Sequence, residues 1–175
     1  MTMPPQLRKF ALAGHIACSV GMLGAIACFL ALAVAGLASQ DIQMIRAAYL
    51  AMDLTAWFVI VPLAFASLLI GIVQSLGTAW GLFRHYWVVA KLLLTVFATI
   101  VLLLQMKSIG YMARMAAETN FSGGDLFQAR LSLVVHAGAG LLVLLVPLAL
   151  SVYKPRGRTR YGTRKQQKQV ALLQP

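Results

Sequence analysis

Apolar residues run through this chain in four long stretches, at 10–37, 47–74, 87–105 and 131–152. A helix rises ~1.5 Å per residue and the hydrocarbon core of a bilayer is ~30 Å thick, so about 20 residues suffice to cross it. Each stretch therefore predicts a membrane span. Together they predict an all-α transmembrane four-helix bundle that forms one domain, residues 1–153, followed by a tail at 154–175.

The connections between the spans are polar and unequal in length. Residues 39–46 and 75–86 form short links, whereas 106–130 is the longest connection. We expect the first part of this connection to lie on the membrane surface as a short amphipathic helix, and its Gly-Gly pair to mark a turn. Pro62 lies near the middle of the second span and predicts a kink there, because proline removes a backbone hydrogen bond.

The composition agrees with lipid as the solvent of this chain. Hydrophobic residues make up 61% and charged residues only 11%, whereas soluble domains carry about 25% charged residues. The net charge is +11, and no acidic residue follows the last span. This distribution indicates a basic tail and not a nucleic-acid-binding domain. We expect the tail to be flexible and to contact anionic lipid headgroups, at about 1 kcal/mol per basic residue. These residues are Lys154, Arg156, Arg158, Arg160, Arg164, Lys165 and Lys168.

An even number of spans places both termini on one side of the membrane. Arg8, Lys9, Arg84 and the basic tail fall on that side, while the charges of the opposite loops nearly cancel. Because basic residues favour the cytoplasm, the pattern predicts that both termini are cytoplasmic.

Four ionisable residues lie within the predicted spans, where a charge costs about 2.5–3.5 kcal/mol. His15 and Lys91 are at similar depth near the cytoplasmic side, and Asp53 and His136 are at similar depth near the external side. Polar residues at helical spacing accompany the inner pair and predict a polar crevice between spans one, two and three. These polar residues include Ser19, Thr95 and Gln74.

Structural roles for the same four residues stay open. Lys91 is close enough to the interface for its ammonium group to reach water. Asp53 and His136 can pair as a structural clamp, and a histidine within a span often serves packing alone.

The histidines also bear on cofactor binding. An axial offset of roughly 15 Å argues against one haem held by both His15 and His136, whereas a haem or porphyrin bound at His15 stays open. A copper site that includes His136 is a further alternative, because thioethers suit Cu(I) and five methionines lie near the external side. The same methionines equally suit gap filling between helices. They are Met44, Met52, Met106, Met112 and Met115.

Three segments carry a resemblance to known proteins: LAGHIACSVGMLGA, AAYLAMDLTAWFVIVPLAFASLLIGIVQSLGT and WGLFRHYWVVAKLLLTVFATIVLLL. Over about residues 7–160 the chain resembles a family of small four-span bacterial membrane proteins, common in actinobacteria, to which no reaction is assigned. This resemblance implies the bacterial plasma membrane.

A second resemblance is short. His15 before a small-residue patch, with Trp87 and Lys91 opening a later span, is distantly similar to copper-resistance-D-type membrane proteins and J-type protoporphyrinogen oxidases. Those proteins usually carry a Trp-x-Gly pattern where this chain has Met22-Leu23-Gly24. The resemblance to the oxidases implies His15 and Lys91 as haem or porphyrin contacts.

The sequence thus predicts a polytopic integral membrane protein, and three kinds of function fit it. The first is a small ligand-binding or accessory protein that uses the polar crevice, as a homo-oligomer or with a membrane partner. The second is a haem- or porphyrin-binding oxidoreductase that uses His15 and Lys91, and the third handles copper at His136. No catalytic set of known geometry stands out, so a non-enzymatic role is favoured.

Overall fold

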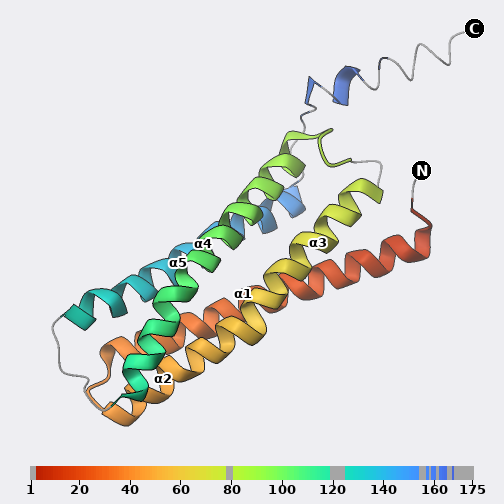
Figure 1. Ribbon diagram of the computed structural model, residues 1–175. Helices are drawn as coiled ribbons and strands as arrows, with labels where there is room; N and C mark the ends of the chain where they lie inside the picture. Colours follow the sequence, from red (N-terminus) through yellow and green to blue (C-terminus); the bar gives the residue numbers. More distant parts are fainter. Residues whose placement is uncertain are drawn as a thin grey trace, which may run out of the picture.

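The computed structural model describes residues 3–77, 81–118 and 125–153, and in the tail residues 157, 159, 160, 162–164 and 167. Its elements are α1 Pro5–Ala38, α2 Ile42–Thr55, η1 Ala56–Ile60, α3 Val61–Gly77, α4 Tyr86–Ala117 and α5 Asp125–Tyr153. Within these residues there is no strand, and the all-α prediction is confirmed (Figure 1). Four helices are long and apolar enough to cross a membrane, the second of them running unbroken from Ile42 to Gly77.

The second span contains a π-helical segment, η1, between α2 and α3. Here the Val61 N–H donates to the Ala56 carbonyl, five residues back instead of four. Pro62 follows directly. Its ring has no N–H and would clash with the carbonyl four residues before it, so a wider turn at this point relieves the helix. The irregularity predicted at Pro62 therefore lies in the turn just before it.

The third span is longer than the sequence prediction, which ends it at 105 and adds a separate surface helix. In the structure α4 continues to Ala117 as one helix. The amphipathic pattern beyond 105 belongs to the same helix, whose apolar face packs into the bundle and is not laid on the membrane surface. The buried residues on this face are Met106, Ile109, Met112, Ala113 and Ala116.

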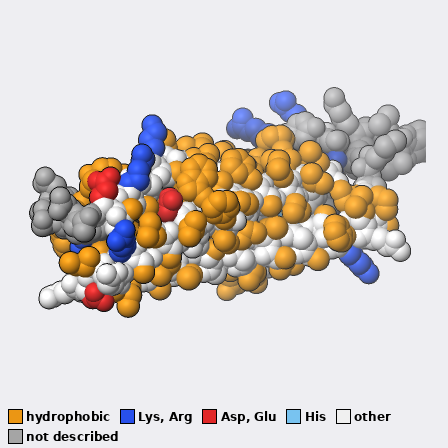
Figure 2. Space-filling view, turned by 60° about the horizontal axis from the view of Figure 1, so that its bottom comes forward, with side chains coloured by type: hydrophobic (Ala, Val, Ile, Leu, Met, Phe, Trp, Pro, Cys, Tyr) orange, Lys and Arg blue, Asp and Glu red, His pale blue; other side chains and the backbone are white. Residues whose placement is uncertain are grey.

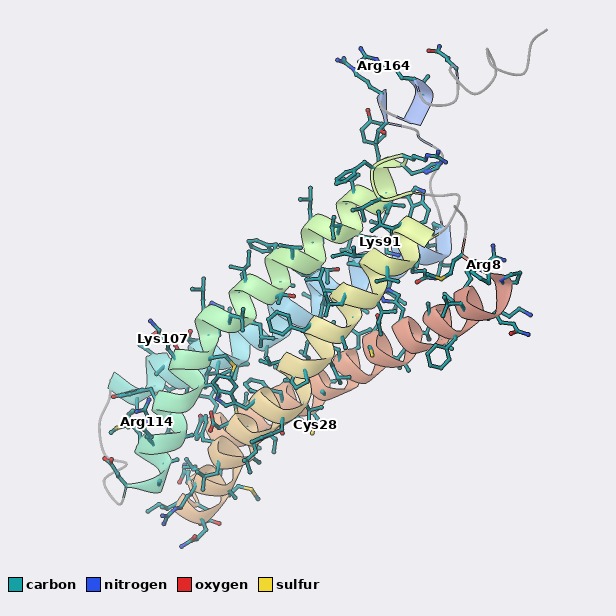
Figure 3. All side chains as sticks on the ribbon, turned by 45° about the vertical axis from the view of Figure 1, so that its right-hand side comes forward. Arg8, Cys28, Lys91, Lys107, Arg114 and Arg164 are labelled. Carbon is teal, nitrogen blue, oxygen red and sulfur yellow. The ribbon has the colours of Figure 1, made fainter. Side chains whose placement is uncertain are left out.

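The bundle has two unlike halves. We call the half where α1 begins and α5 ends the basic half, and the opposite half, where α2 and α5 begin, the mixed half. Figure 3 shows Arg8, Lys91 and Arg164 in the basic half, and Lys107 and Arg114 in the mixed half. The four acidic residues of the chain, Asp41, Asp53, Glu118 and Asp125, all belong to the mixed half, together with Arg46, Lys107, Arg114 and Arg130.

The large buried core lies in the mixed half. There, aromatic and methionine side chains such as Phe29, Tyr49, Met52 and Met112 pack between the helices and are 5% exposed or less. Between the two ends, the outer surface is covered by apolar side chains, as expected where lipid is the neighbour (Figure 2). Toward the basic half, α1 and α3 diverge from α4 and α5 (Figure 1).

The tail touches the loop between α3 and α4. Thr159 donates its backbone N–H to the Arg84 carbonyl (3.0 Å) and its hydroxyl to the Phe83 carbonyl. Arg160 and Arg164 are exposed. The other five basic residues predicted to contact lipid headgroups, Lys154, Arg156, Arg158, Lys165 and Lys168, lie outside the described residues.

Candidate functional site

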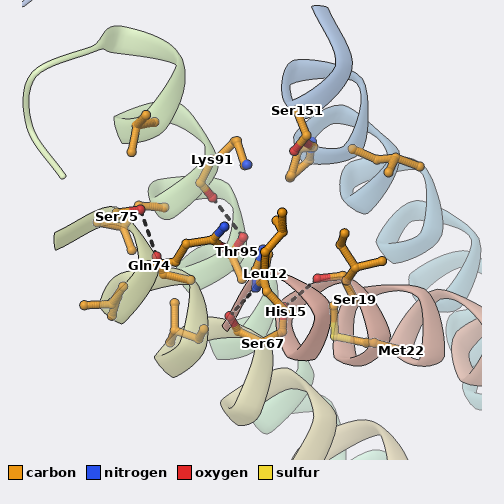
Figure 4. Close-up of a pocket in the computed structure, with 18 of the residues that line it drawn as sticks. Leu12, His15, Ser19, Met22, Ser67, Gln74, Ser75, Lys91, Thr95 and Ser151 are labelled. Carbon is orange, nitrogen blue, oxygen red and sulfur yellow. Dashed lines mark hydrogen bonds between the residues drawn. The ribbon is translucent and has the colours of Figure 1, made fainter. Parts of the chain in front are cut away.

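A cavity of about 700 Å³ lies in the basic half, between α1, α3, α4 and α5 (Figure 4). This volume is within the range of ligand pockets, about 300–1,000 Å³. Its walls combine aliphatic side chains with a small set of polar ones. The polar ones used below are His15, Ser19, Ser67, Gln74, Lys91 and Thr95.

His15 is held by α3. The ring nitrogen Nδ1 lies 3.1 Å from the Ser67 carbonyl oxygen, and the ring packs against Gly71. Since a carbonyl only accepts hydrogen bonds, Nδ1 carries the proton and Nε2 is left with a lone pair in the neutral ring. The Ser19 and Ser67 hydroxyls are hydrogen-bonded to each other at 2.9 Å. The small residues of α3 thus let the imidazole lie close to the helix.

Lys91 enters the cavity from α4. Its ammonium nitrogen lies 5.4 Å from the centroid of the Trp87 ring, one turn nearer the basic end. Cation–π contacts at this distance are attractive, more so away from water. Thr95 follows one turn later and donates its hydroxyl to the Lys91 carbonyl at 2.8 Å.

The cavity is closed toward the mixed half. Met22, Ala64 and Leu144 form a small buried cluster at that end, and each is 8% exposed or less. Beyond this cluster lies the core of the mixed half. The site is therefore a blind pocket and not a pore in this structure.

The charge of the cavity has one sign. Arg8, Lys9 and Lys91 contribute to its lining, and none of the described lining residues is acidic. The four acidic residues of the chain belong to elements of the mixed half. The charged residues of the described lining are therefore all basic.

The structure brings together the residues predicted for the inner site. His15, Lys91, Ser19, Thr95 and Gln74 all line the one cavity. Their predicted role as cofactor or ligand contacts stays a prediction. The sequence predicts a crevice between spans one, two and three, and this set of spans is incomplete because a fourth span also lines the cavity.

The sequence analysis did not predict that the fourth span, α5, lines the cavity. It contributes Pro147 and Ser151 to the wall, and the Ser151 hydroxyl donates to the Pro147 carbonyl at 2.8 Å. A proline and a serine four residues apart in an apolar run were the available signal for this wall.

The outer pair does not assemble. His136 is exposed, and its Nδ1 bonds to the Ser132 carbonyl (2.7 Å) of its own helix. Asp53 is half-buried and faces α4 near Gly110. No hydrogen bond or ion pair joins these two described residues, because equal depth on two helices does not place them on facing sides.

One contact between a buried aromatic ring and an arginine in the mixed half was not predicted from the sequence. Tyr49 is 1% exposed, and the Arg130 guanidinium lies 6.0 Å from the centroid of its ring. Gly36 of α1 admits the Tyr49 ring at close range. This contact is structural, and it joins α1, α2 and α5.

Metal ligands are not grouped in the part of the chain that the structure describes. There, no three His, Cys, Asp or Glu side chains are placed to hold an ion. Met52, Met106 and Met112 are buried in the core, whereas His136 is exposed. The structure thus does not unite His136 with these methionines.

The fold and the cavity define a multi-pass helical membrane protein with a blind, positively charged pocket. No protein-family model, no curated protein and no solved structure matches this chain. The resemblances noted from the sequence therefore stay predictions, and the function has to be argued from the cavity.

Proposed function

We propose that this protein binds a small ligand in the cavity of its basic half. The observation that carries the proposal is the contrast between the two halves of one bundle. Large side chains fill the mixed half, whereas the same helices present Ser19, Ser67, Gly71 and Thr95 around an open volume in the basic half. Polar groups at membrane depth are expensive, and they typically mark a functional site.

We place the protein in the bacterial plasma membrane with both termini in the cytoplasm. The excess of basic residues in the basic half supports this orientation through the positive-inside rule. The cavity would then lie in the cytoplasmic half of the membrane. In this setting the protein acts as a ligand-binding or accessory subunit, as a homo-oligomer or beside a membrane partner.

A haem or porphyrin at His15 is the second candidate, because one observation favours it. A histidine that donates Nδ1–H to a backbone carbonyl has the ring orientation and the available Nε2 that are typical of metal-binding histidines. His15 has this arrangement with Ser67, and Lys91 lines the same cavity as a partner for a carboxylate.

The test is to identify the small molecules and metals that stay bound to the protein when it is purified in a mild neutral detergent. Native mass spectrometry, the visible spectrum and metal analysis are compared for wild type, His15→Ala and the matched control His136→Ala. The proposal predicts a bound molecule that is lost in His15→Ala and kept in His136→Ala. A Soret band with the same behaviour selects the haem alternative, and copper lost only in His136→Ala selects the copper prediction. A preparation that binds no small molecule contradicts the proposed function.

A further inference from the structure

We infer that the ligand of this cavity is an apolar molecule that dissolves in the bilayer and donates a hydrogen bond to Nε2 of His15, as an alcohol or a phenol does. This inference rests on the proposed function and specifies its ligand class. It depends on which hydrogen-bonding groups of the wall are already used, and on where apolar lining residues reach the outer surface.

The hydroxyl groups around the cavity donate their hydrogens within the protein. Three of them donate to the carbonyl four residues earlier on their own helix, each at 2.8 Å: Ser75, Thr95 and Ser151. Ser19 and Ser67 are hydrogen-bonded to each other, so one of these two hydroxyls also donates. A hydroxyl that has donated its hydrogen keeps its lone pairs and can still accept. Four of these five hydroxyl hydrogens are thus used, whereas the oxygens can accept from a ligand.

His15 adds an acceptor that has no donor of its own. Its Nδ1 donates to the Ser67 carbonyl, so Nε2 of the neutral ring carries a lone pair and no hydrogen. No residue in the described part of the chain donates a hydrogen bond to Nε2. The ring lies in the wall of the cavity, which Gln74 and Thr95 line from two other helices (Figure 4). An acceptor that is kept from water and lacks a donor is costly, so a ligand that donates to Nε2 is stabilised here.

Apolar lining residues reach the outer surface between α1 and α5. Leu12 and Ile16 of α1 line the cavity and are 44% and 52% exposed, and Leu148 of α5 lines it and is 44% exposed. Gly14 packs against Ile70 of α3, so Ile16, two residues further along α1, faces away from α3. Among the residues that the structure describes, this side of the cavity is therefore continuous with the surface that faces lipid.

The position of this opening and the free acceptor together define the ligand class. A molecule that reaches the cavity through lipid is apolar over most of its surface, and the buried Met22 and Leu144 close the cavity with further apolar surface. A polar group that only accepts, such as an ether or an ester, would leave Nε2 without a hydrogen bond. An alkylphenol or a long-chain alcohol meets both conditions.

The experiment measures the binding of three compounds to the purified protein: para-octylphenol, its methyl ether para-octylanisole, and phenol, which lacks the alkyl chain. Native mass spectrometry at one concentration of a neutral detergent gives the Kd for wild type, for His15→Phe and for His136→Phe. Phenylalanine removes the ring nitrogens and keeps a flat ring. His136 is the matched control, because it is exposed and its Nδ1 bonds to a carbonyl of its own helix in the mixed half.

We expect octylphenol to bind wild type and His136→Phe alike, about fivefold more tightly than octylanisole, because the two compounds differ by one neutral hydrogen bond. In His15→Phe this preference should disappear, so that both compounds bind equally. The ratio of the two Kd values is the readout, since a general loosening of the cavity affects both compounds alike. Phenol at equal concentration should not displace octylphenol, because the alkyl chain supplies most of the apolar burial.

A preference for octylphenol that persists in His15→Phe, or no preference in wild type, would overturn the donor class while leaving ligand binding intact. Displacement of octylphenol by phenol would overturn the bilayer-dissolved class in favour of a small donor from water. Binding of none of the three compounds, by a protein that still carries another molecule, would overturn this inference alone. The same result with a protein that carries no bound molecule would overturn the proposed function itself.

If size exclusion shows that His15→Phe does not fold, the same hydrogen bond is tested in wild type. In protein labelled with nitrogen-15 histidine, octylphenol should shift the Nε2 resonance of His15, and octylanisole should leave it in place. His85→Phe and His136→Phe assign the other two histidines of the chain. An Nε2 resonance of His15 that does not move at saturating octylphenol would overturn the inference.

Discussion

Gly36 of α1 packs against the Tyr49 side chain of α2, and this contact allows a sharp test of the fold. A Cβ atom at Gly36 would lie 3.0, 3.1 and 3.2 Å from three atoms of the Tyr49 side chain. The Tyr49 ring is 1% exposed and packs within the core, so it has little room to retreat. Overpacking of a filled core costs about 1–3 kcal/mol. We therefore expect Gly36→Ala to lower the free energy of unfolding by that amount.

The measurement is reversible unfolding in mixed micelles, by titration with dodecyl sulfate and helix content by circular dichroism. Gly24→Ala is the matched control, because it lies on the same helix and a Cβ there would meet nothing within 4 Å. Alanine has the better helix propensity by up to about 1 kcal/mol, so the control should be neutral or slightly stabilised. Equal stability of Gly36→Ala and Gly24→Ala would show that α1 and α2 do not approach as described.

Three further predictions test other contacts. A double-mutant cycle of Ser19→Ala and Ser67→Ala should give a coupling of about 0.6 kcal/mol, typical of hydrogen bonds between membrane helices; a coupling of zero would remove this hydrogen bond from the site. Thr159→Val loses the hydroxyl bond to the Phe83 carbonyl and should make the tail more sensitive to trypsin, whereas an unchanged cleavage rate would contradict the docking of the tail. Lys168→Cys, in a background without the native cysteines, should react with a membrane-impermeant maleimide only after the cells are opened, and labelling of intact cells would reverse the proposed orientation.

The number and class of the helices could be predicted from the sequence because the apolar runs are long. Their ends could not. The sequence prediction ends the third span at Gln105, where polar residues begin, but helix formation depends on backbone hydrogen bonds and on a buried face. From Met106 to Ala116 that face is continuous, so α4 extends past the polar residues.

Part of the candidate site could also be predicted. Depth and helical periodicity placed His15 and Lys91 together, and both line the cavity. The same reasoning failed for Asp53 and His136, because the position of a side chain in a bundle depends both on its depth in the membrane and on its direction around the helix axis, and the sequence gives only the depth. The direction in which a side chain points around the helix axis depends on which helices are neighbours. That information is tertiary, which is also why the contribution of α5 was missed.

Small residues at facing positions contribute to the cavity, together with the divergence of the helices toward the basic half. At the level of His15, the facing residues Ser67 and Gly71 are small, whereas Tyr49 and Met52 fill the corresponding space in the mixed half. Association of helices in lipid depends on van der Waals packing and hydrogen bonds, because lipid is as apolar as leucine. Larger side chains in the basic half would add such packing without any change of fold. A bundle selected for stability alone would gain from filling this volume, and this is the physical reason for proposing that a ligand occupies it.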